Sequence, residues 1–354
     1  MDSKSKVLVQ NSELSNLYED IAKDILKNLV FDSSHENQIN QLLFISMLEN
    51  ALSHLADDTL DLFNKPKDEI SKLNIEFYKN FDLSKYCTWR SGCLADYIFY
   101  PKNPNDLNRL ISLKKNFYMV GNGSNTLFIN LKDTILISTK KMNSIKFDGE
   151  HVTVECGAAL NVVMNKCLDK GLLGFEFSTG IPGTIGGALI TNAGANGGEI
   201  SDILKSVFLI KNGKEIEVGK EEIEFNYRSS SIKRNEIITR ARFLLKKGDP
   251  DKARMQIKEY LRHRNNTQPV RWPSAGSVFK NPLPNYAGYI IENLGLKGLS
   301  IGDAQVSNIH SNYIINKNNA SPENILSLIN AVKDKVLTET GIKLENEVRI
   351  IDEK

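Results

Sequence analysis

Apolar side chains recur with two different periods along the chain, and the change of period divides it. Within the first 70 residues they return at helical spacing, as in Leu42, Ile45 and Leu48. That segment contains no glycine, and its single proline is Pro66. The pattern therefore predicts a helical N-terminal extension over residues 1–70, with no recognisable chemistry of its own and no partner that the residues identify.

Beyond Cys87 the pattern changes to short apolar runs separated by glycine and asparagine. Such runs predict strands, and the longer stretches of helical period between them predict helices. The expected strands are Asp96–Tyr100, Phe117–Val120, Thr134–Ser138, Val152–Cys156, Ser206–Ile210 and Glu236–Leu245, and the expected helices are Asn105–Lys114 and Leu160–Lys170. Strands that alternate with helices indicate an α/β or α+β domain.

A helix rich in lysine and arginine, Pro250–Arg264, follows and leads to a last region with its own strand and helix order. In that region the pattern predicts Ser277–Phe279, Tyr313–Asn316 and Val348–Ile351 as strands, and Ala287–Leu294 and Pro322–Thr340 as helices. We therefore expect three parts, an extension over 1–70, a domain over 71–247 and a C-terminal domain over 248–354.

Composition is that of an ordinary globular protein, with 41% hydrophobic and 25% charged residues among 354. A net charge of +2 gives no reason to expect nucleic acid as a partner. The first ten residues lack the apolar core of a signal peptide, and no run approaches the ~20 apolar residues of a membrane span. The four cysteines form no C-x-x-C pair, and no zinc-ligand spacing is present, so no metal is expected. These features favour a cytoplasmic protein without membrane insertion.

A glycine-containing segment directly follows the predicted strand Phe117–Val120. It reads Gly121, Asn122, Gly123, Ser124 and Asn125. Two glycines allow a tight turn with exposed backbone N–H groups, which suits an anionic phosphate. The third glycine of the dinucleotide fingerprint is absent, because Thr126 stands there. A tight turn without a ligand explains this segment alone equally well.

A second segment holds seven glycines among residues 180–198. Each glycine costs about 1 kcal/mol relative to alanine in regular structure, so core packing is no reason for so many. A flexible loop is the alternative, but apolar and proline residues interrupt the run. The part that we expect along a ligand is Gly180, Ile181, Pro182, Gly183, Thr184, Gly186 and Gly187. Two such segments together indicate a large phosphate-bearing cofactor.

Three further segments carry polar groups suited to a carboxylate substrate. Arg228 lies beside Tyr227 in N-Y-R-S-S and can hold a carboxylate in a bidentate contact. An arginine on the protein surface without a ligand would give the same sequence pattern. Ser277 lies among small residues in P-S-A-G-S-V-F-K-N-P. Because the G-x-S-x-G elbow of a nucleophilic serine is absent, the two interpretations left for Ser277 are a proton donor and a plain turn. Glu347 in L-E-N-E-V-R is typical of a solvated acid at a strand edge.

In this order, the segments closely resemble the UDP-N-acetylenolpyruvoylglucosamine reductase family. The resemblance begins near Leu83 and covers about three quarters of the chain, through GNGSN, GIPGTIGGA, NAGANGGE, YRSS, SAGSVFKNP, AGYIIENLGLKG and NEVR. It implies an α+β fold, with a two-lobed FAD-binding domain of the vanillyl-alcohol-oxidase (PCMH) type and a C-terminal α+β substrate domain. The short passage between YRSS and SAGSVFKNP resembles the compact branch that lacks an inserted fold.

The resemblance also implies the chemistry. Non-covalent FAD takes hydride from NADPH and passes it to the enolpyruvyl carbon of a UDP-sugar enol ether, giving UDP-N-acetylmuramate for peptidoglycan. The family pattern makes Ser277 the proton donor and puts Arg228, helped by Glu347, on the substrate carboxylate. Residues 121–125 would hold the FAD pyrophosphate, residues 180–187 would run along the cofactor, and Arg264 would face the flavin. Tyr227, Asn281 and Lys297 would bind the substrate.

The chain departs from the family pattern in one turn, where Cys93 replaces a glycine and Leu94 a proline. This change predicts a local difference in the turn and does not involve Ser277, Arg228 or Glu347. Two other functions remain open, an FAD-dependent oxidase of the same superfamily and a catalytically silent flavoprotein that acts as a binding module.

Overall fold

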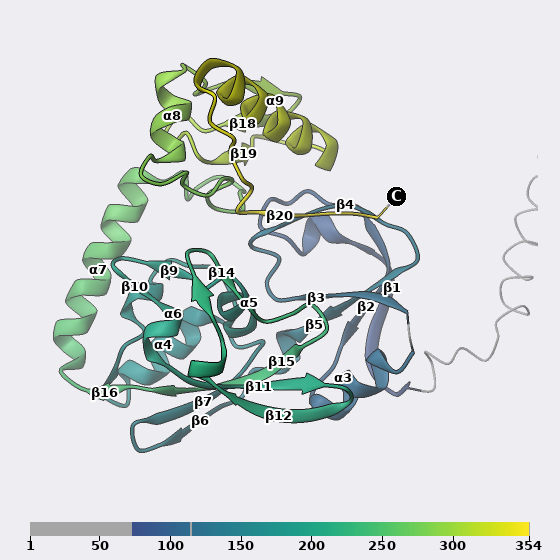
Figure 1. The fold of residues 1–354 in the computed structure, drawn as a ribbon, viewed down its shortest axis with the longest axis vertical. Helices are drawn as coiled ribbons and strands as arrows, with labels where there is room; N and C mark the ends of the chain where they lie inside the picture. Colours follow the sequence, from purple (N-terminus) through teal and green to yellow (C-terminus); the bar gives the residue numbers. More distant parts are fainter. Residues whose placement is uncertain (1–72, 114, 354) are drawn as a thin grey trace, which may run out of the picture. The chain divides into compact units, whose positions relative to one another are not determined.

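Two β-sheets organise the part of the chain that the computed structural model describes, residues 73–113 and 115–353. The predicted extension over residues 1–70 lies outside these residues. The first sheet has the strand order β1-β2-β5-β3, with β1 antiparallel to β2 and the other neighbours parallel (Figure 1). Its elements and connections are β1 Glu76–Asp82, η2 Leu83–Lys85, β2 Leu94–Tyr100, α3 Pro104–Ile111, β3 Asn116–Val120, β4 Thr126–Leu131, β5 Thr134–Ser138 and η3 Thr139–Lys141.

The second sheet is antiparallel throughout, with the order β12-β11-β15-β7-β6. Its strands are β6 Ile145–Asp148, β7 His151–Glu155, β11 Leu204–Lys211, β12 Lys214–Gly219 and β15 Ile237–Leu244. The glycine-rich segment and short elements are inserted between these strands. They are α4 Leu160–Leu168, β8 Leu172–Leu173, η4 Glu176–Ser178, α5 Ile185–Ile190, β9 Gly194–Ala195, β10 Gly198–Glu199, α6 Ile200–Ile203, η5 Lys220–Glu222, β13 Phe225–Asn226, β14 Ser229–Ser230 and β16 Lys246–Lys247.

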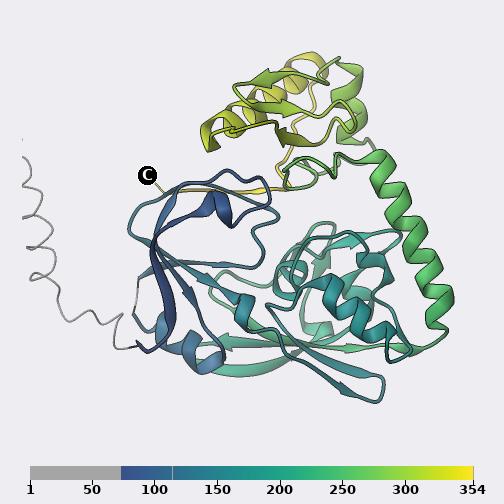
Figure 2. The same cartoon turned by 180° about the vertical axis from the view of Figure 1, so that it is seen from behind.

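A long helix leads from the second sheet to the C-terminal elements, as both views show (Figures 1 and 2). This helix is α7 Pro250–Thr267. Asp249 caps its first turn, because its side chain accepts hydrogen bonds from the backbone N–H groups of Asp251 and Lys252. The elements beyond it are α8 Ala287–Asn293, β17 Ser300–Ile301, β18 Ala304–Val306, β19 Ile314–Asn316, α9 Pro322–Thr340 and β20 Arg349–Glu353. Strands β17, β18 and β19 form a small antiparallel sheet that α9 contacts.

The last strand returns to the beginning of the described chain. β20 pairs in parallel with β4, with Arg349 opposite Thr126. A single cluster of buried apolar residues also joins the two regions, and it contains Trp89 and Phe128 together with Phe279 and Val332. The Trp89 indole donates a hydrogen bond to the carbonyl of Ile314 at 2.7 Å. Residues 75–354 form one compact unit, so the boundary predicted near residues 247–250 stays a prediction.

Most predicted elements are confirmed, with shifts of a few residues at their ends. Helix α9 has the predicted bounds, and α3 ends at Ile111, before the predicted end. The predicted strand Ser277–Phe279 is wrong, because that segment forms only an isolated bridge, from Phe279 to Asn346. In the turn with the two family replacements, the positive φ falls on Arg90, at 52°, and not on a replaced position. Cys93 does not have a positive φ, and Leu94 begins β2 with its side chain exposed, so the turn needs neither glycine nor proline.

Candidate active site

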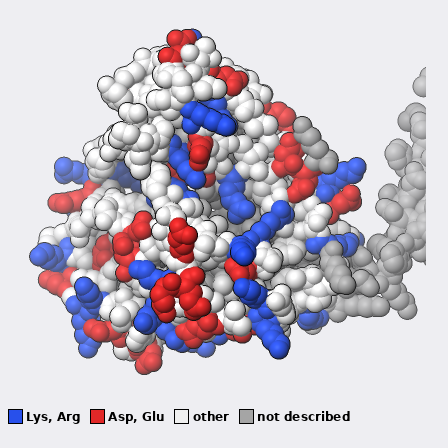
Figure 3. All heavy atoms as spheres, in the orientation of Figure 1, with Lys and Arg blue, Asp and Glu red and all other residues white. Residues whose placement is uncertain are grey.

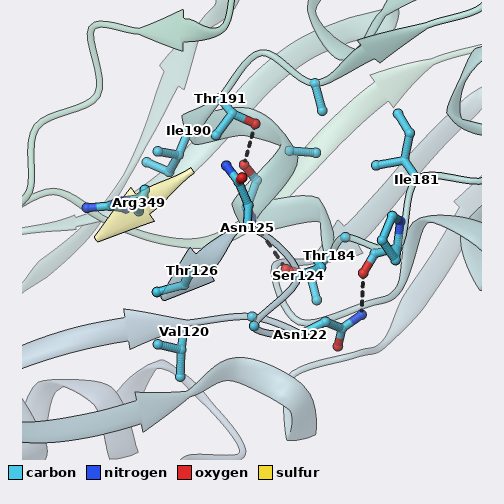
Figure 4. Close-up of a pocket in the computed structure, with 18 of the residues that line it drawn as sticks. Val120, Asn122, Ser124, Asn125, Thr126, Ile181, Thr184, Ile190, Thr191 and Arg349 are labelled. Carbon is cyan, nitrogen blue, oxygen red and sulfur yellow. Dashed lines mark hydrogen bonds between the residues drawn. The ribbon is translucent and has the colours of Figure 1, made fainter. Parts of the chain in front are cut away.

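One cavity of about 370 Å³ gathers the glycine-rich segments and the polar residues of the C-terminal region. Its volume lies in the range of small-molecule sites. Its wall comes from residues 117–126, from residues 181–195, from the loop before β15 and from the segment around Ser277. Figure 4 shows Asn122, Ser124 and Asn125 on one side of the cavity and Ile181 and Thr184 facing them. The two glycine segments therefore face each other, as a cofactor site requires.

The turn of residues 121–125 is held from outside the cavity. The Tyr86 hydroxyl contacts the carbonyl oxygen of Gly121 and, at 2.7 Å, the hydroxyl of Ser138. Across the cavity, the Asn122 side chain donates to the carbonyl of Pro182 at 3.2 Å (Figure 4). A Cβ atom at Gly121 would lie 2.4 Å from Thr184 Oγ1, so glycine is required for this approach.

The backbone of this turn fits a phosphate. The N–H groups of residues 122–125 donate no hydrogen bond to another described residue. Successive free N–H groups in a tight turn form a site for an anion, and a dinucleotide cofactor such as FAD carries a pyrophosphate. The residues present therefore fit FAD at this end of the cavity.

Arg264 reaches the cavity from the last turn of α7. It packs over Gly180, where a Cβ atom would lie 2.5 Å from the arginine Cδ. Gly180 also has a φ of +81°, which favours glycine. Gly180 is absent from the cavity wall, and the missing side chain allows the close approach of Arg264.

Arg228 and Glu347 form an ion pair in the cavity wall, with Arg228 Nε 2.8 Å from Glu347 Oε1. The Nε–H is not aligned for a hydrogen bond to any described residue, so the contact is electrostatic. Arg228 has a φ of 57°, a left-handed conformation that a non-glycine residue adopts at some energetic cost. Its guanidinium also lies 5.3 Å from the centre of the Tyr227 ring.

Burial raises the pKa of Glu347, while the charges of Arg228 and Lys280 act in the opposite direction. Burial is therefore the larger effect on this carboxyl group. The Arg228 charge opposes this effect and favours the carboxylate form. The pair leaves the two terminal guanidinium nitrogens of Arg228 as the donors that an incoming carboxylate can meet.

Ser277 lies in the wall of the same cavity, on a segment held from both sides. On one side, the N–H of Val278 donates to the carbonyl of Asn312 at 2.9 Å. On the other side, the N–H of Glu347 donates to the carbonyl of Val278 at 2.8 Å. The serine and the acid are thus placed by neighbouring, hydrogen-bonded segments.

The C-terminal strand connects this region with the turn of residues 121–125. The Asn125 side chain donates to the carbonyl of Glu347 at 3.1 Å, and the N–H of Arg349 donates to the carbonyl of Asn125 at 3.0 Å. Both hydrogen bonds lie at the point where the pairing of β20 with β4 begins. Glu347 therefore reaches the cavity because the chain returns to the first sheet.

The structure brings most of the predicted site residues to one cavity. Arg228, Ser277, Glu347 and Arg264 line it, and so do all predicted cofactor residues apart from Gly180. The predicted substrate residues do not line it. Asn281 donates its N–H to the Tyr227 hydroxyl at 3.5 Å and accepts from the N–H of Ala287 at the start of α8. Lys297 pairs with Glu292 at 2.6 Å.

Several residues of the cavity wall received no role from the sequence. They are Arg349, Lys233, Arg234, Gln268 and Tyr313. The sequence signal for a positively charged cavity is the pair Lys233 and Arg234, soon after YRSS, together with Arg349 in NEVR. Figure 3 shows lysine and arginine side chains along the centre of one face, with charges of both signs elsewhere. Nothing in the sequence marks Tyr313, which lies in an apolar run.

Two family models match the chain. The model described as FAD binding domain matches residues 95–219, and the model described as UDP-N-acetylenolpyruvoylglucosamine reductase, C-terminal domain, matches residues 268–351. The fold and the cavity thus define an FAD-dependent oxidoreductase of α+β architecture.

The chain is similar to curated UDP-N-acetylenolpyruvoylglucosamine reductases over most of its length. It is 40% identical to that of Caldicellulosiruptor bescii over 79% of this chain and 92% of the relative, and 37% identical to that of Clostridium novyi over 84% and 98%. The crystal structure of the reductase from Thermus caldophilus superimposes with a TM-score of 0.69 at 31% identity, over 79% of this chain and 99% of that one. The chain belongs to the UDP-N-acetylenolpyruvoylglucosamine reductase family.

In the described part of the chain, every helix is too short or too polar to span a bilayer.

Proposed function

We propose that this chain reduces the enolpyruvyl group of a UDP-sugar enol ether, UDP-N-acetyl-3-O-(1-carboxyvinyl)-glucosamine, to give UDP-N-acetylmuramate for peptidoglycan. The observation that carries the proposal is the meeting of Arg228, Ser277 and Glu347 in the cavity that the two glycine segments enclose. A carboxylate clamp, a proton donor and a cofactor cradle in one cavity suit the reduction of an unsaturated carboxylate.

Bound FAD supplies the hydride chemistry, with NADPH as the donor and the enolpyruvyl group as the acceptor. Residues 121–125 hold its pyrophosphate through their free N–H groups, and Arg264 and residues 181–187 line its path. These roles rest on the geometry of the cavity wall and on the family to which the chain belongs.

Arg228 binds the substrate carboxylate and stabilises the negative charge that develops there. Addition of hydride to the terminal carbon leaves an electron pair shared between C2 and the carboxylate. A permanent cation with two parallel N–H donors matches that charge. Glu347 contacts Nε at 2.8 Å and holds the guanidinium in place without competing for its terminal nitrogens.

Ser277 supplies the proton that completes the reaction at C2. Its hydroxyl lies in the cavity wall, on a segment that hydrogen bonds fix on both sides. The Oγ–H bond breaks, a C2–H bond forms, and the electron pair of the O–H bond remains on the serine oxygen.

The substrate residues of the proposal are Tyr227, Asn281 and Lys297. The contact between Asn281 and Tyr227 joins the YRSS segment to the segment after Ser277, and this supports a shared role. A cytoplasmic location is also part of the proposal, and the free state of all four cysteines supports it. The proposal names no protein partner.

The Ser277→Ala variant tests the assignment of the proton donor. Reduction of the flavin by NADPH should keep its wild-type rate, and reoxidation by the UDP-sugar enol ether should slow by about 10²–10⁴-fold, the usual effect of losing a general acid. Stopped-flow absorbance of the flavin measures the two half-reactions separately. Reoxidation at the wild-type rate would remove Ser277 from the mechanism.

NADPH consumption with and without the UDP-sugar enol ether separates the rival functions. Consumption that requires the sugar nucleotide supports the reductase. Consumption that ignores it, with uptake of oxygen, would favour an oxidase, and the absence of consumption would favour a silent flavoprotein.

A further inference from the structure

Two carbonyl groups of the turn of residues 121–125 are held by the segment of residues 86–88. The carbonyl oxygen of Gly121 accepts a hydrogen bond from the Tyr86 hydroxyl. The carbonyl oxygen of Gly123 accepts one from the backbone N–H of Thr88 at 3.2 Å. Neither Tyr86 nor Thr88 lines the cavity, so both carbonyl groups are drawn toward the protein behind the turn.

The direction of each carbonyl group sets the direction of the next N–H group. In a planar trans peptide, the C=O bond and the N–H bond point to opposite sides. With the Gly121 carbonyl turned to Tyr86, the N–H of Asn122 points away from Tyr86, and the second carbonyl does the same for the N–H of Ser124. Asn122 and Ser124 line the cavity, and their N–H groups donate to no described residue. These are the N–H groups that a phosphate would meet.

The number of protons fixes the hydrogen bonds at Tyr86. A carbonyl oxygen can only accept, so the single proton of the phenol goes to Gly121. The contact with Ser138 Oγ at 2.7 Å must then use a lone pair of the phenol oxygen, with the serine hydroxyl as the donor. Both side chains are buried. Burial also raises the pKa of Tyr86, so the phenol keeps its proton at ordinary pH.

The Tyr86 ring is held by contacts that do not involve its hydroxyl. Lys140 Nζ lies 3.8 Å from the ring centre, and the centre of the Phe81 ring is 6.3 Å away. The backbone N–H of Tyr86 donates to the carbonyl of Leu83 at 3.0 Å. A Cβ atom at Gly123 would lie 3.0 Å from Tyr86 Cδ1, so the turn passes directly over the ring. A phenylalanine at position 86 can keep all of these contacts.

We propose that Tyr86 is a positioning residue for the pyrophosphate of FAD. Its hydroxyl holds the Gly121 carbonyl away from the cavity and so presents the N–H of Asn122 to the phosphate. Without the hydroxyl, the peptide group between Gly121 and Asn122 can rotate, because glycine restricts its backbone least. A rotated carbonyl oxygen would face the phosphate and repel it. Tyr86 does not line the cavity, so it acts only through the turn.

This inference rests on the proposed function, in which residues 121–125 hold the pyrophosphate, and Tyr86→Phe tests it in the holoenzyme. The dissociation constant of FAD should rise by about 10- to 100-fold, the usual value of one hydrogen bond to a charged group. Fluorescence of the flavin that is released when the holoenzyme is diluted measures this constant. With excess FAD, both half-reactions should stay within about threefold of wild type, since Tyr86 contacts neither Ser277 nor Arg228.

Two fragments of the cofactor give a readout that a merely structural role would not give. ADP carries the pyrophosphate without the flavin ring, and riboflavin carries the ring without the pyrophosphate. The affinity for each follows from its displacement of FAD from the holoenzyme. Tyr86→Phe should weaken ADP by the same factor as FAD and should leave the affinity for riboflavin unchanged, because the hydroxyl acts only on the N–H groups that meet the phosphate.

The double variant Tyr86→Phe/Ser138→Ala shows whether the serine acts through the phenol. It should bind FAD no more weakly than Tyr86→Phe alone, because Ser138 has no hydroxyl to orient once the phenol is gone. Tyr260→Phe is the control for loss of a tyrosine hydroxyl. That hydroxyl accepts a hydrogen bond from Gln256 within α7, and the control should keep the wild-type dissociation constant.

Each outcome bears on one of the two proposals. If the wild-type protein holds FAD and Tyr86→Phe holds it as tightly, the positioning role is wrong and the proposed function stands. A loss of riboflavin affinity equal to that of FAD, an unchanged affinity for ADP, or a further loss in the double variant would also overturn the positioning role. If the wild-type holoenzyme consumes no NADPH with the UDP-sugar enol ether, the proposed function is wrong, whatever the affinity for FAD.

Discussion

Gly121→Ala tests whether the close approach of the two glycine segments builds the cofactor site. The new methyl group would lie 2.4 Å from Thr184 Oγ1 and 3.2 Å from Thr184 Cγ2. Thr184 is 1% exposed, and its Oγ1 accepts from the N–H of Gly187 at the start of α5. The threonine therefore cannot move away without losing this cap. Gly121 has no positive φ, so alanine brings no backbone strain and the effect is steric.

The expected cost has two parts. Overpacking of a buried contact costs about 1–3 kcal/mol, and displacement of an N-cap side chain costs about 1 kcal/mol. We expect Gly121→Ala to lower the free energy of unfolding of the FAD-free protein by about 2–4 kcal/mol, from these two terms. Thr184→Ala alone should cost about 1 kcal/mol, the value of the cap.

The double variant Gly121→Ala/Thr184→Ala distinguishes this explanation from general damage. Removal of the threonine side chain makes room for the methyl group, so the double variant should lose only about 1 kcal/mol, which is less than the sum of the single losses. Urea unfolding followed by circular dichroism gives all four values. Gly183→Ala is the control, because its methyl group would meet no atom closer than 3.6 Å. Additive losses in the cycle would refute the steric argument.

Two further variants test the ion pair. Burial raises the pKa of Glu347 above its ordinary value of 4.5, so folding takes up a proton and the free energy of unfolding falls as the pH rises from 4.5 through the raised pKa. Glu347→Gln should abolish this fall in urea unfolding series across that window, and an unchanged slope would contradict the assignment. Arg228→Lys should lower kcat/KM for the UDP-sugar enol ether by about 10- to 100-fold, because an ammonium cannot make the bidentate contact. Flavin reduction by NADPH is its internal control, and an equal loss in both half-reactions would argue against a carboxylate clamp.

Local signals fixed the longer elements of the fold. Helix α9 has the predicted bounds because Ser321 caps its first turn, Pro322 follows, and Gly341 ends it in a left-handed conformation. The two-residue strands were not predicted, since a period cannot be read from two residues. The strand predicted at Ser277 was wrong for a related reason. Its apolar residues Val278 and Phe279 are buried as in a strand, but the hydrogen bonds go to two loops.

The candidate site was predicted from ordered motifs, and single residues alone did not define it. Glu347 would pass for a solvated acid, and its burial depends on a strand that pairs with residues more than 200 positions earlier. Tyr313 gave no signal, because a tyrosine in an apolar run is normally a packing residue. Its hydroxyl contacts Gln268, the residue that ends helix α7, and no local pattern contains this contact.

The return of the C-terminal strand also links the two halves of the site mechanically. Asn125, in the turn of residues 121–125, donates a hydrogen bond from its side chain to the carbonyl of Glu347, and its own carbonyl oxygen accepts one from the N–H of Arg349. Glu347 in turn bonds to Val278, the neighbour of Ser277, and holds Arg228. The turn of residues 121–125, the acid, the arginine and the segment of Ser277 therefore belong to one connected set of hydrogen bonds and an ion pair.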